Sequence, residues 1–348
     1  MAKIFILGAT GYLGGTILDH LSTTYPALSI TAMARDQDKA NLITAVYPSV
    51  RTVIGNLDSS DIIIPESSAA DIIITAADCD HPDHVKYIYE GMAKNTSGKP
   101  IYLIHTSGTG VLIDLSFERA GESKQSAISD KVWDDVEDIE EIYNLPMDQM
   151  HKPVESQVQA PPLEKNPNIK YAIVSPPLIY GVGSGPVNKL NTLCPWLFQT
   201  IVKNGKGFTL GKGDCGWSNV HVGDLADLYA LLVGEALKED GGKATWGRAG
   251  GWYFAENGMD KWCDVAREVT RISYEKGYLK STEVEGLGVE KVQELNAIGP
   301  YVWGTNSVSK ASRARRELGW EPKRKSMWEL IPEDIDIMEK KLGMSAAA

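Results

Sequence analysis

The chain has 348 residues, of which 43% are hydrophobic and 23% charged, so it can form one large domain with a smaller lobe. Its 46 acidic and 35 basic residues give a net charge of −11, which argues against nucleic acid or an anionic membrane as the main partner. The apolar N-terminal run is too short for a secretory signal, and no run approaches the ~20 apolar residues that span a bilayer.

Strand and helix patterns alternate from the N-terminus. An apolar run at residues 3–7 ends at a glycine-rich turn, and residues 12–21 then carry apolar side chains at helical spacing. Further strand patterns lie at residues 29–34, 50–54, 71–77, 100–105 and 170–174, and a helical pattern lies at 84–94. This alternation predicts an α/β protein with a Rossmann-type, doubly wound parallel sheet.

The composition changes near residue 181, where glycine and proline become frequent, and all nine tryptophans lie at or after Trp133. A helical pattern at residues 222–234 is typical of a return to the main domain. We therefore predict a Rossmann domain of residues 1–182 and 216–245, and a smaller C-terminal substrate-binding lobe of residues 183–215 and 246–335. The tryptophans fit an aromatic substrate pocket and a lobe core equally well.

A glycine-rich turn at residues 8–14 joins the first strand to the first helix. Its glycines allow a tight turn, a close approach of backbone to phosphate, and close packing of helix on strand. The turn follows a buried strand and opens a helix, which favours dinucleotide binding over a purely structural turn. The residues expected at the pyrophosphate are Gly8, Thr10, Gly11, Tyr12, Leu13 and Gly14.

The second predicted strand ends at Arg35, about where an NAD-specific site carries an acidic residue on the ribose 2′-hydroxyl. A guanidinium can instead pair with a 2′-phosphate, and Lys39 follows one turn later. Asp36 complicates this interpretation, and a solvated surface arginine is the alternative. These residues favour NADP(H) over NAD(H) as the cofactor.

Several segments together resemble the extended short-chain dehydrogenase/reductase superfamily, of the NAD-dependent epimerase/dehydratase type. They are GATGYLG at 8–14, Gly-Asn-Leu at 55–57, HTSGTG at 105–110, SPPLIYG at 175–181, NVHVGDLADLY at 219–229 and KASRARRELGWEP at 310–322. Their order and spacing extend the resemblance over nearly the whole chain.

The resemblance implies roles for individual residues. It puts Asn56 and Leu57 near the adenine and Ala76 and Ala77 beside the cofactor. It gives Ser107 the hydrogen bond to the reacting oxygen, with a turn residue after a strand as the alternative. Lining of the nicotinamide is implied for Pro176, Leu178 and Ile179.

The tyrosine of this superfamily, with a lysine four residues later, is missing: none of the 14 tyrosines has lysine at that offset. The resemblance aligns the catalytic helix with residues 146–160, where Met147 and His151 take the two positions. His151 is a candidate proton donor because its pKa ordinarily lies near neutrality. Lys152 or Tyr180 are alternative donors, and a third alternative is a chain that binds the cofactor without turning it over.

Residues 78–84 collect side chains that ligate metals, and His81 and His84 would share a helix face. Acidic residues and a proline also typically begin a helix, so we predict no metal site. The four cysteines are scattered without the paired spacing of a zinc motif or a disulfide framework, which indicates a reduced, cytoplasmic protein.

Together these patterns predict an NADP(H)-dependent oxidoreductase that reduces a carbonyl, or an imine, of a small, fairly apolar molecule, with Ser107 and His151 as catalytic residues. The alternatives are a non-catalytic NADP(H) sensor of the NmrA-like kind and an epimerase or dehydratase that recycles its cofactor. The expected partner is the small-molecule substrate, without nucleic acid or membrane, and the chain is expected to be a monomer or homodimer.

Overall fold

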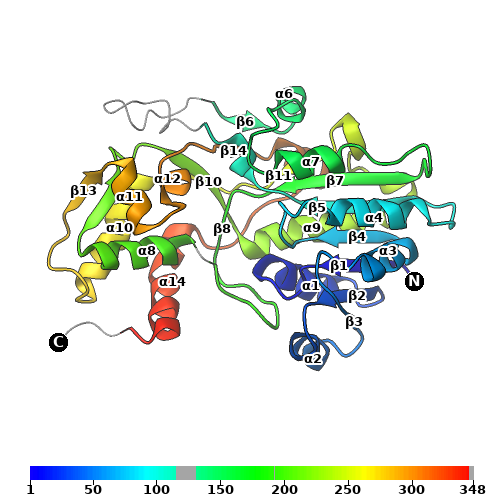
Figure 1. Ribbon diagram of the computed structural model, residues 1–348, viewed down its shortest axis with the longest axis horizontal. Coiled ribbons are helices and arrows are strands. Elements are labelled where there is room, and N and C mark those ends of the chain that lie inside the picture. The colour runs from blue at the N-terminus through cyan, green and yellow to red at the C-terminus, as the bar shows by residue number, and fades with distance from the viewer. Residues whose placement is uncertain (115–130, 192, 345–348) are drawn as a thin grey trace.

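The computed structural model describes residues 1–114, 131–191 and 193–344. Seven strands form one sheet in the order β11-β7-β5-β4-β1-β2-β3 (Figure 1), and each neighbouring pair is parallel. In chain order the strands are β1 (Lys3–Leu7), β2 (Ser29–Ala34), β3 (Arg51–Ile54), β4 (Ile72–Thr75), β5 (Ile101–Thr106), β7 (Ile169–Ser175) and β11 (Trp252–Phe254). The predicted Rossmann-type α/β fold is confirmed.

Helices cover both faces of this sheet. The contacts group α3 with α4 and α4 with α7, while α1 packs against α9 on the opposite face (Figure 1). The helices are α1 (Tyr12–Thr24), α2 (Gln37–Val46), α3 (Ser60–Ala69), α4 (His84–Ala93), α7 (Lys152–Val158) and α9 (Val222–Ala236). The central strands β4 and β5 are buried along their whole length, because a parallel sheet has no face left for water.

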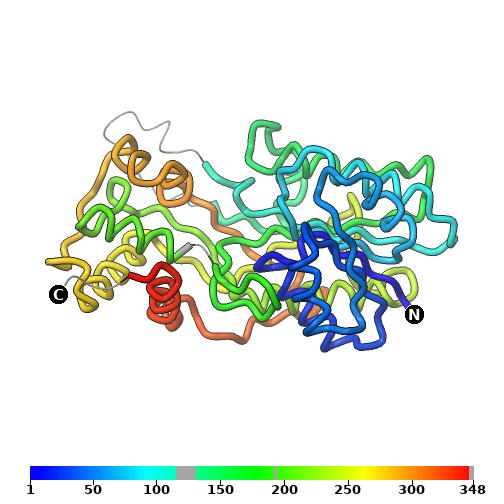
Figure 2. Tube along the Cα trace, turned by 60° about the horizontal axis from the view of Figure 1, so that its bottom comes forward, coloured from blue at the N-terminus to red at the C-terminus, as the bar shows by residue number. Residues whose placement is uncertain are grey.

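A smaller lobe with its own core lies beside the Rossmann domain (Figure 2). Its elements are α8 (Leu193–Asn204), β9 (Gly207–Leu210), α10 (Trp262–Glu275), β13 (Val284–Leu287), α11 (Val289–Leu295), α12 (Gly299–Trp303) and α14 (Met327–Leu342). Trp262 and Trp303 are buried in this core, and the Trp303 ring meets Phe208 edge-on with centroids 5.6 Å apart. These tryptophans are therefore core residues of the lobe.

Short elements connect the two bodies. One three-stranded sheet has the order β12-β10-β8, and a separate pair joins β14 to β6. These short elements are β6 (Trp133–Asp134), β8 (Leu178–Tyr180), β10 (Gly216–His221), β12 (Met259–Lys261) and β14 (Ser309–Lys310). Helices α6 (Ile139–Tyr143) and α13 (Ser312–Leu318) pack against the Rossmann core. Within the described ranges, no helix combines the length and apolar character needed to cross a membrane.

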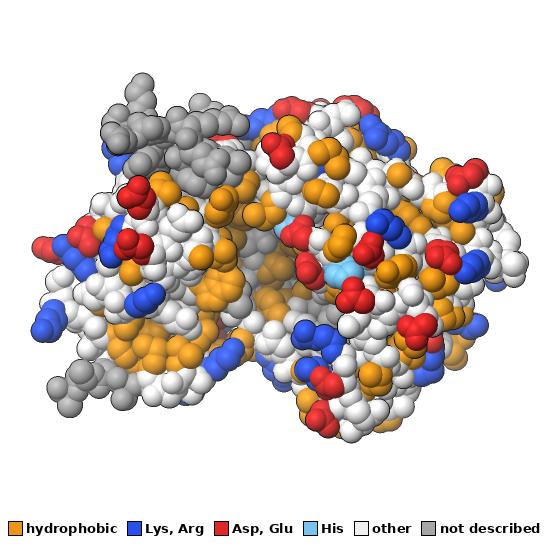
Figure 3. Space-filling model, viewed as in Figure 1, with side chains coloured by type: hydrophobic (Ala, Val, Ile, Leu, Met, Phe, Trp, Pro, Cys, Tyr) orange, Lys and Arg blue, Asp and Glu red, His pale blue; other side chains and the backbone are white. Residues whose placement is uncertain are grey.

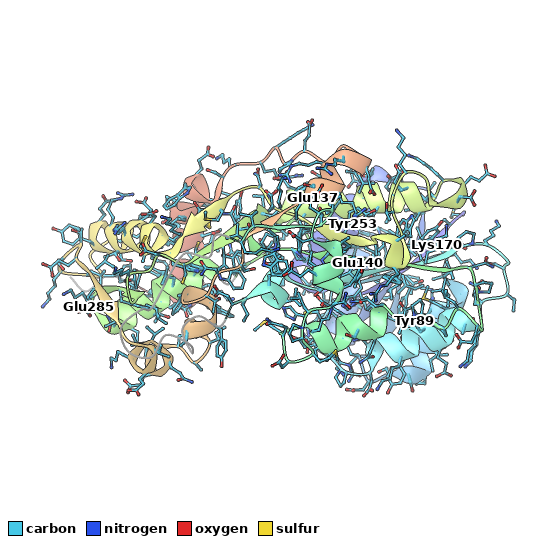
Figure 4. The ribbon with its side chains drawn as sticks, turned by 90° about the horizontal axis from the view of Figure 1, so that it is seen from above. Tyr89, Glu137, Glu140, Lys170, Tyr253 and Glu285 are labelled. Carbon is cyan, nitrogen blue, oxygen red and sulfur yellow. The ribbon has the colours of Figure 1, made fainter. Side chains whose placement is uncertain are left out.

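The lobe boundary expected from the sequence differs from this arrangement. Strand β11, within the expected lobe segment 246–335, instead extends the Rossmann sheet by pairing with β7, and α13 packs against it. Trp320 is also buried in the Rossmann core. In Figure 4, Tyr253 of β11 accordingly lies in the Rossmann domain, whereas Glu285 of β13 lies at the far end of the lobe. A three-residue strand carries too little periodicity to be assigned from sequence.

Candidate active site

A cavity of about 520 Å³ lies at the carboxyl ends of β1 to β4. Parallel strands end at one edge of the sheet, so the loops that follow them meet there. Most of the residues predicted to bind the dinucleotide line the cavity: Gly8, Thr10, Gly11, Arg35, Asn56, Leu57, Ala76 and Ala77. The lining also contains residues that the sequence analysis did not assign, namely Met33, Gly55, Asp58, Asp78 and His81.

The turn at the start of α1 is built for close backbone approach. Gly8 has a φ of +89°, and a Cβ atom there would lie 2.3 Å from the Ala76 carbonyl oxygen. A Cβ atom on Gly14 would lie 2.2 Å from the Gly8 carbonyl oxygen. Gly11 precedes the helix without a side-chain cap, and the first turn has no acidic residue. The helix N-terminus is thus suited to an anionic phosphate.

Other residues predicted for the cofactor do not line this cavity. Three belong to packing around the turn: the Tyr12 hydroxyl donates to the Gly181 carbonyl at 2.5 Å, Leu13 is buried in the core, and Gly14 meets Gly8. Pro176 accepts a hydrogen bond from the Thr109 amide, at 2.9 Å, through its carbonyl oxygen. Leu178 and Ile179 pair with β10.

Arg35 and Asp36 are neighbours in the sequence but make different contacts. The Arg35 side chain lines the cavity, and within residues 1–114, 131–191 and 193–344 it forms no ion pair. The Asp36 carboxylate instead caps α2, accepting from the Lys39 amide at 2.9 Å, and forms an ion pair with the Lys39 ammonium. Lys39 is therefore engaged with Asp36 and does not line the cavity.

Ser107 lies just after β5 and is buried, as is Glu155 on α7. The Ser107 hydroxyl donates to Glu155 Oε1 at 2.5 Å, while Oε2 has no partner among the described residues. Burial raises the pKa of Glu155 to about 7, although the hydrogen bond from Ser107 lowers it. The sequence analysis did not assign Glu155, because nothing local indicates that it contacts a residue 48 positions away.

His151 is the N-cap residue of α7 and has a φ of +67°, in the left-handed region. Its Nδ1 atom lies 2.8 Å from Asp80 Oδ1 and 3.3 Å from Cys79 Sγ. Its Nε2 atom faces the loop after Ser107, since a Cβ atom on Gly108 would lie 3.1 Å from it. Burial lowers the pKa of His151, but the hydrogen bonds to Asp80 and Cys79 outweigh burial and raise it to about 10.

The alternative donors considered from the sequence are engaged elsewhere. The buried Lys152 ammonium donates to the carbonyls of Ile142 and Tyr143, at 3.0 and 2.9 Å. The Tyr180 hydroxyl donates to the Lys325 carbonyl at 3.0 Å. At the C-terminal end of α7, the Tyr89 hydroxyl of α4 (Figure 4) donates to the Val158 carbonyl and anchors the helix.

The Glu155→Gln variant is expected to change how stability depends on pH. A carboxyl whose folded pKa is raised holds its proton in the folded state while the unfolded chain has released it. Unfolding free energy therefore falls as pH rises from about 4.5 to about 7, by about 1.4 kcal/mol per unit of pKa difference. The variant should lose this fall, as measured by urea unfolding at pH 4.5 and 7.5. Equal slopes for the variant and the parent chain would contradict the elevated pKa.

The family comparison covers the Rossmann part of the chain. The sequence model of the NAD dependent epimerase/dehydratase family matches residues 4–244. A curated relative, the oxidase ucsJ of an Acremonium species, is 29% identical over 350 residues, covering 99% of each chain. An uncharacterized protein of Saccharomyces cerevisiae is 22% identical over 349 residues, covering 94% of this chain and 97% of its own.

Solved structures of low sequence identity share the fold. UDP-glucose 4-epimerase from Thermotoga maritima superposes with a TM-score of 0.62 at 15% identity, covering 98% of this chain and 99% of that one. A dTDP-glucose 4,6-dehydratase from Streptomyces venezuelae, with NAD bound, gives 0.65 at 14% identity and 97% coverage of both. The match over residues 4–244, together with the Rossmann sheet and its glycine turn, confirms the resemblance, and the chain belongs to the NAD dependent epimerase/dehydratase family.

Proposed function

We propose that this chain is an NADP(H)-dependent oxidoreductase acting on a carbonyl, or an imine, of a small and fairly apolar molecule. An unbroken series of contacts leads from the dinucleotide cavity to His151 and Ser107. Ala76 and Ala77 line the dinucleotide cavity, and Cys79, two residues later, contacts His151. The His151 ring in turn packs on the loop that follows Ser107. One chain of contacts thus joins the cofactor cavity to both candidate catalytic residues.

Two neighbouring charged residues support a preference for NADP(H): Asp36 is paired with Lys39, whereas Arg35 lines the cavity. Asp36 would repel a 2′-phosphate, but its carboxylate is held by the Lys39 amide and ammonium at the start of α2. Arg35 lines the cavity, where its guanidinium can form a bidentate pair with a phosphate.

Replacing Arg35 by alanine is expected to weaken NADPH binding by about tenfold to a hundredfold, the loss of about 1.5–3 kcal/mol for a charge-assisted contact. NADH binding should change little, because NADH lacks the 2′-phosphate. Quenching of intrinsic fluorescence during titration measures both affinities. Lys39→Ala is the matched control and should have a smaller effect, since Lys39 pairs with Asp36. Equal losses for NADPH and NADH would refute the assignment of Arg35.

The chemistry divides between the cofactor and the chain. When bound, the nicotinamide supplies or accepts the hydride. The His151 Nδ1 atom donates to Asp80 at 2.8 Å, and Cys79 Sγ lies 3.3 Å away. The Asp80 side chain is 53% exposed, and we propose that the substrate carbonyl oxygen takes its place as the acceptor of the Nδ1 proton during reduction. Nε2 is the less suitable nitrogen because it faces the backbone of Gly108 and Gly110.

Ser107 would orient the same oxygen. As a donor to Glu155, its hydroxyl has no proton left for a substrate. Once Glu155 is protonated, its carboxyl can donate to Ser107 Oγ, and the serine proton is then free to point at the substrate. The raised pKa of Glu155, about 7, makes this protonated form accessible near neutral pH.

A hollow between the lobe and the Rossmann domain supports an apolar substrate. Figure 3 shows that the wall on the lobe side is largely hydrophobic, whereas the Rossmann side carries acidic side chains and histidine. The proposal is tested by following NADPH consumption with a panel of aldehydes, ketones and imines of increasing apolar area. We expect turnover that rises with apolar area. Absence of turnover with every compound, in a chain shown to bind NADPH, would favour a sensor and overturn the proposal.

A further inference from the structure

Three side chains that commonly ligate metals converge beside the dinucleotide cavity. Cys79 and Asp80 follow β4, and His151 directly precedes α7. Cys79 Sγ, Asp80 Oδ1 and His151 Nδ1 lie within 4.8 Å of one another. Asp80 and His151 are 71 positions apart in the chain, so the fold alone brings the donors together. Cys79 and Asp80 belong to the segment 78–84, for which the sequence analysis predicts no metal site, whereas His81 and His84 of that segment lie outside the cluster.

The arrangement differs from a catalytic relay of cysteine, histidine and aspartate. In such a relay the nucleophile and the carboxylate bind opposite nitrogens of the imidazole ring. Here Sγ and Oδ1 both approach Nδ1, at 3.3 and 2.8 Å, while Nε2 faces Gly108 and Gly110. The three ligand atoms lie within 4.8 Å of one another, which is close enough for them to share one ion.

The spacing and chemistry of the donors suit zinc. Ligand distances of about 2.0 to 2.3 Å in a tetrahedron place neighbouring donor atoms roughly 3.3 to 3.6 Å apart. Shared ligation would open the two separations from Nδ1, 3.3 and 2.8 Å, by a few tenths of an ångström. It would also bring Sγ and Oδ1, which lie within 4.8 Å of each other, into the same range. Sulfur, nitrogen and oxygen donors in one set favour zinc over magnesium or calcium, which take oxygen ligands.

The cluster is also accessible. Cys79 is half-buried, whereas Cys194, Cys215 and Cys263 are buried. The Asp80 side chain is 53% exposed, which leaves a path for an ion and room for water or another ligand in the fourth position. The His151 backbone is left-handed, with a φ of +67°, and strained backbone of this kind often accompanies function.

We propose that Cys79, Asp80 and His151 form a Zn²⁺ site at the edge of the dinucleotide cavity, and that zinc binding there inhibits reduction. Zinc would occupy the position of the Nδ1 proton, so the metal and the proton compete for one lone pair. The binding of zinc stands on the geometry of the three donors alone. Its inhibitory effect rests on the proposed function, in which that proton is donated.

Metal binding is tested with the full chain, stripped by a chelator and titrated with Zn²⁺ in competition with a chromogenic chelator. One equivalent per chain is expected, and Co²⁺ should give a thiolate-to-cobalt charge-transfer band. Cys79→Ser should abolish the band, and Asp80→Asn should weaken zinc binding at least about tenfold. His81→Ala is the matched control and should leave zinc affinity unchanged. A Co²⁺ spectrum without the band, or a band that persists in Cys79→Ser, would overturn the site. Circular dichroism verifies that each variant is folded.

A separate measurement addresses inhibition. One equivalent of Zn²⁺ should suppress NADPH-dependent turnover, and a chelator should restore it. Stoichiometric zinc binding with undiminished turnover would overturn the inhibitory effect and the donor role of the His151 Nδ1 proton, while leaving the metal site intact. Turnover without any zinc binding would overturn the metal site and leave the proposed function standing.

Discussion

Replacing His151 by alanine is expected to slow NADPH-dependent reduction by about 10²- to 10⁴-fold, the usual contribution of a positioned acid. The substrate oxygen would then have to take its proton from water. NADPH affinity should change little, because His151 is not among the residues lining the dinucleotide cavity. Single-turnover rates and binding titrations measure the two effects separately.

Because the backbone at residue 151 is left-handed, alanine at this position is strained, and a second variant is needed to separate strain from the loss of the imidazole. Asparagine tolerates this conformation better than alanine does, yet it carries no acidic proton. His151→Asn should therefore be as slow as His151→Ala while unfolding more like the parent chain. In the parent chain the rate of reduction should fall as pH rises through about 10, where His151 loses its proton, and both variants should lack this fall. A rate near that of the parent chain for His151→Asn would exclude His151 as the donor.

Gly8→Ala is expected to destabilise the fold by several kcal/mol, about 3 to 5, and to abolish dinucleotide binding. The added Cβ atom would lie 2.3 Å from the Ala76 carbonyl oxygen and 2.5 Å from its carbon. Both atoms belong to the backbone that follows the central strand β4, so neither can move without disturbing the sheet. Urea unfolding measures the stability, and fluorescence titration measures NADPH binding.

Gly98 supplies the matched control for this prediction. Its φ of +71° is also in the left-handed region, but a Cβ atom there would meet nothing within 4 Å. Gly98→Ala should thus cost only about 1 kcal/mol of backbone strain and should leave NADPH binding intact. If the two variants lost similar stability, the effect at Gly8 would be conformational strain and not contact with Ala76.

The strands β1 to β5, strand β7 and helix α1 could be predicted because their signals are local. Apolar runs such as residues 3–7 and 29–34 match the observed strands. The placement of the glycine turn and Arg35 at one cavity was also predictable, because the residues that follow parallel strands converge at one edge of the sheet. Strand β11 has only three residues, and only its pairing with β7 identifies it.

The candidate catalytic residues and their partners were harder to predict than the cofactor cavity. His151 was identified by alignment to a family position, but its partners Asp80 and Cys79 lie on another loop, and no local pattern links them to it. Glu155 was not assigned from the sequence, and its contact with Ser107 depends on how α7 packs against the end of β5. Contacts of this kind depend on tertiary packing.

The passage of the chain between its two bodies limits how such a protein can be remodelled. After β11, the edge strand of the Rossmann sheet, the chain enters the lobe through β12 and α10. It then returns to the Rossmann domain, where Trp320 is buried in the core and Arg324 pairs with the buried Asp224. It leaves once more as α14. No single pair of cut points therefore releases the lobe as a module. New specificities in this architecture would arise by substitution at the walls of the hollow, residue by residue, and exchange of an entire lobe between relatives would disrupt both cores.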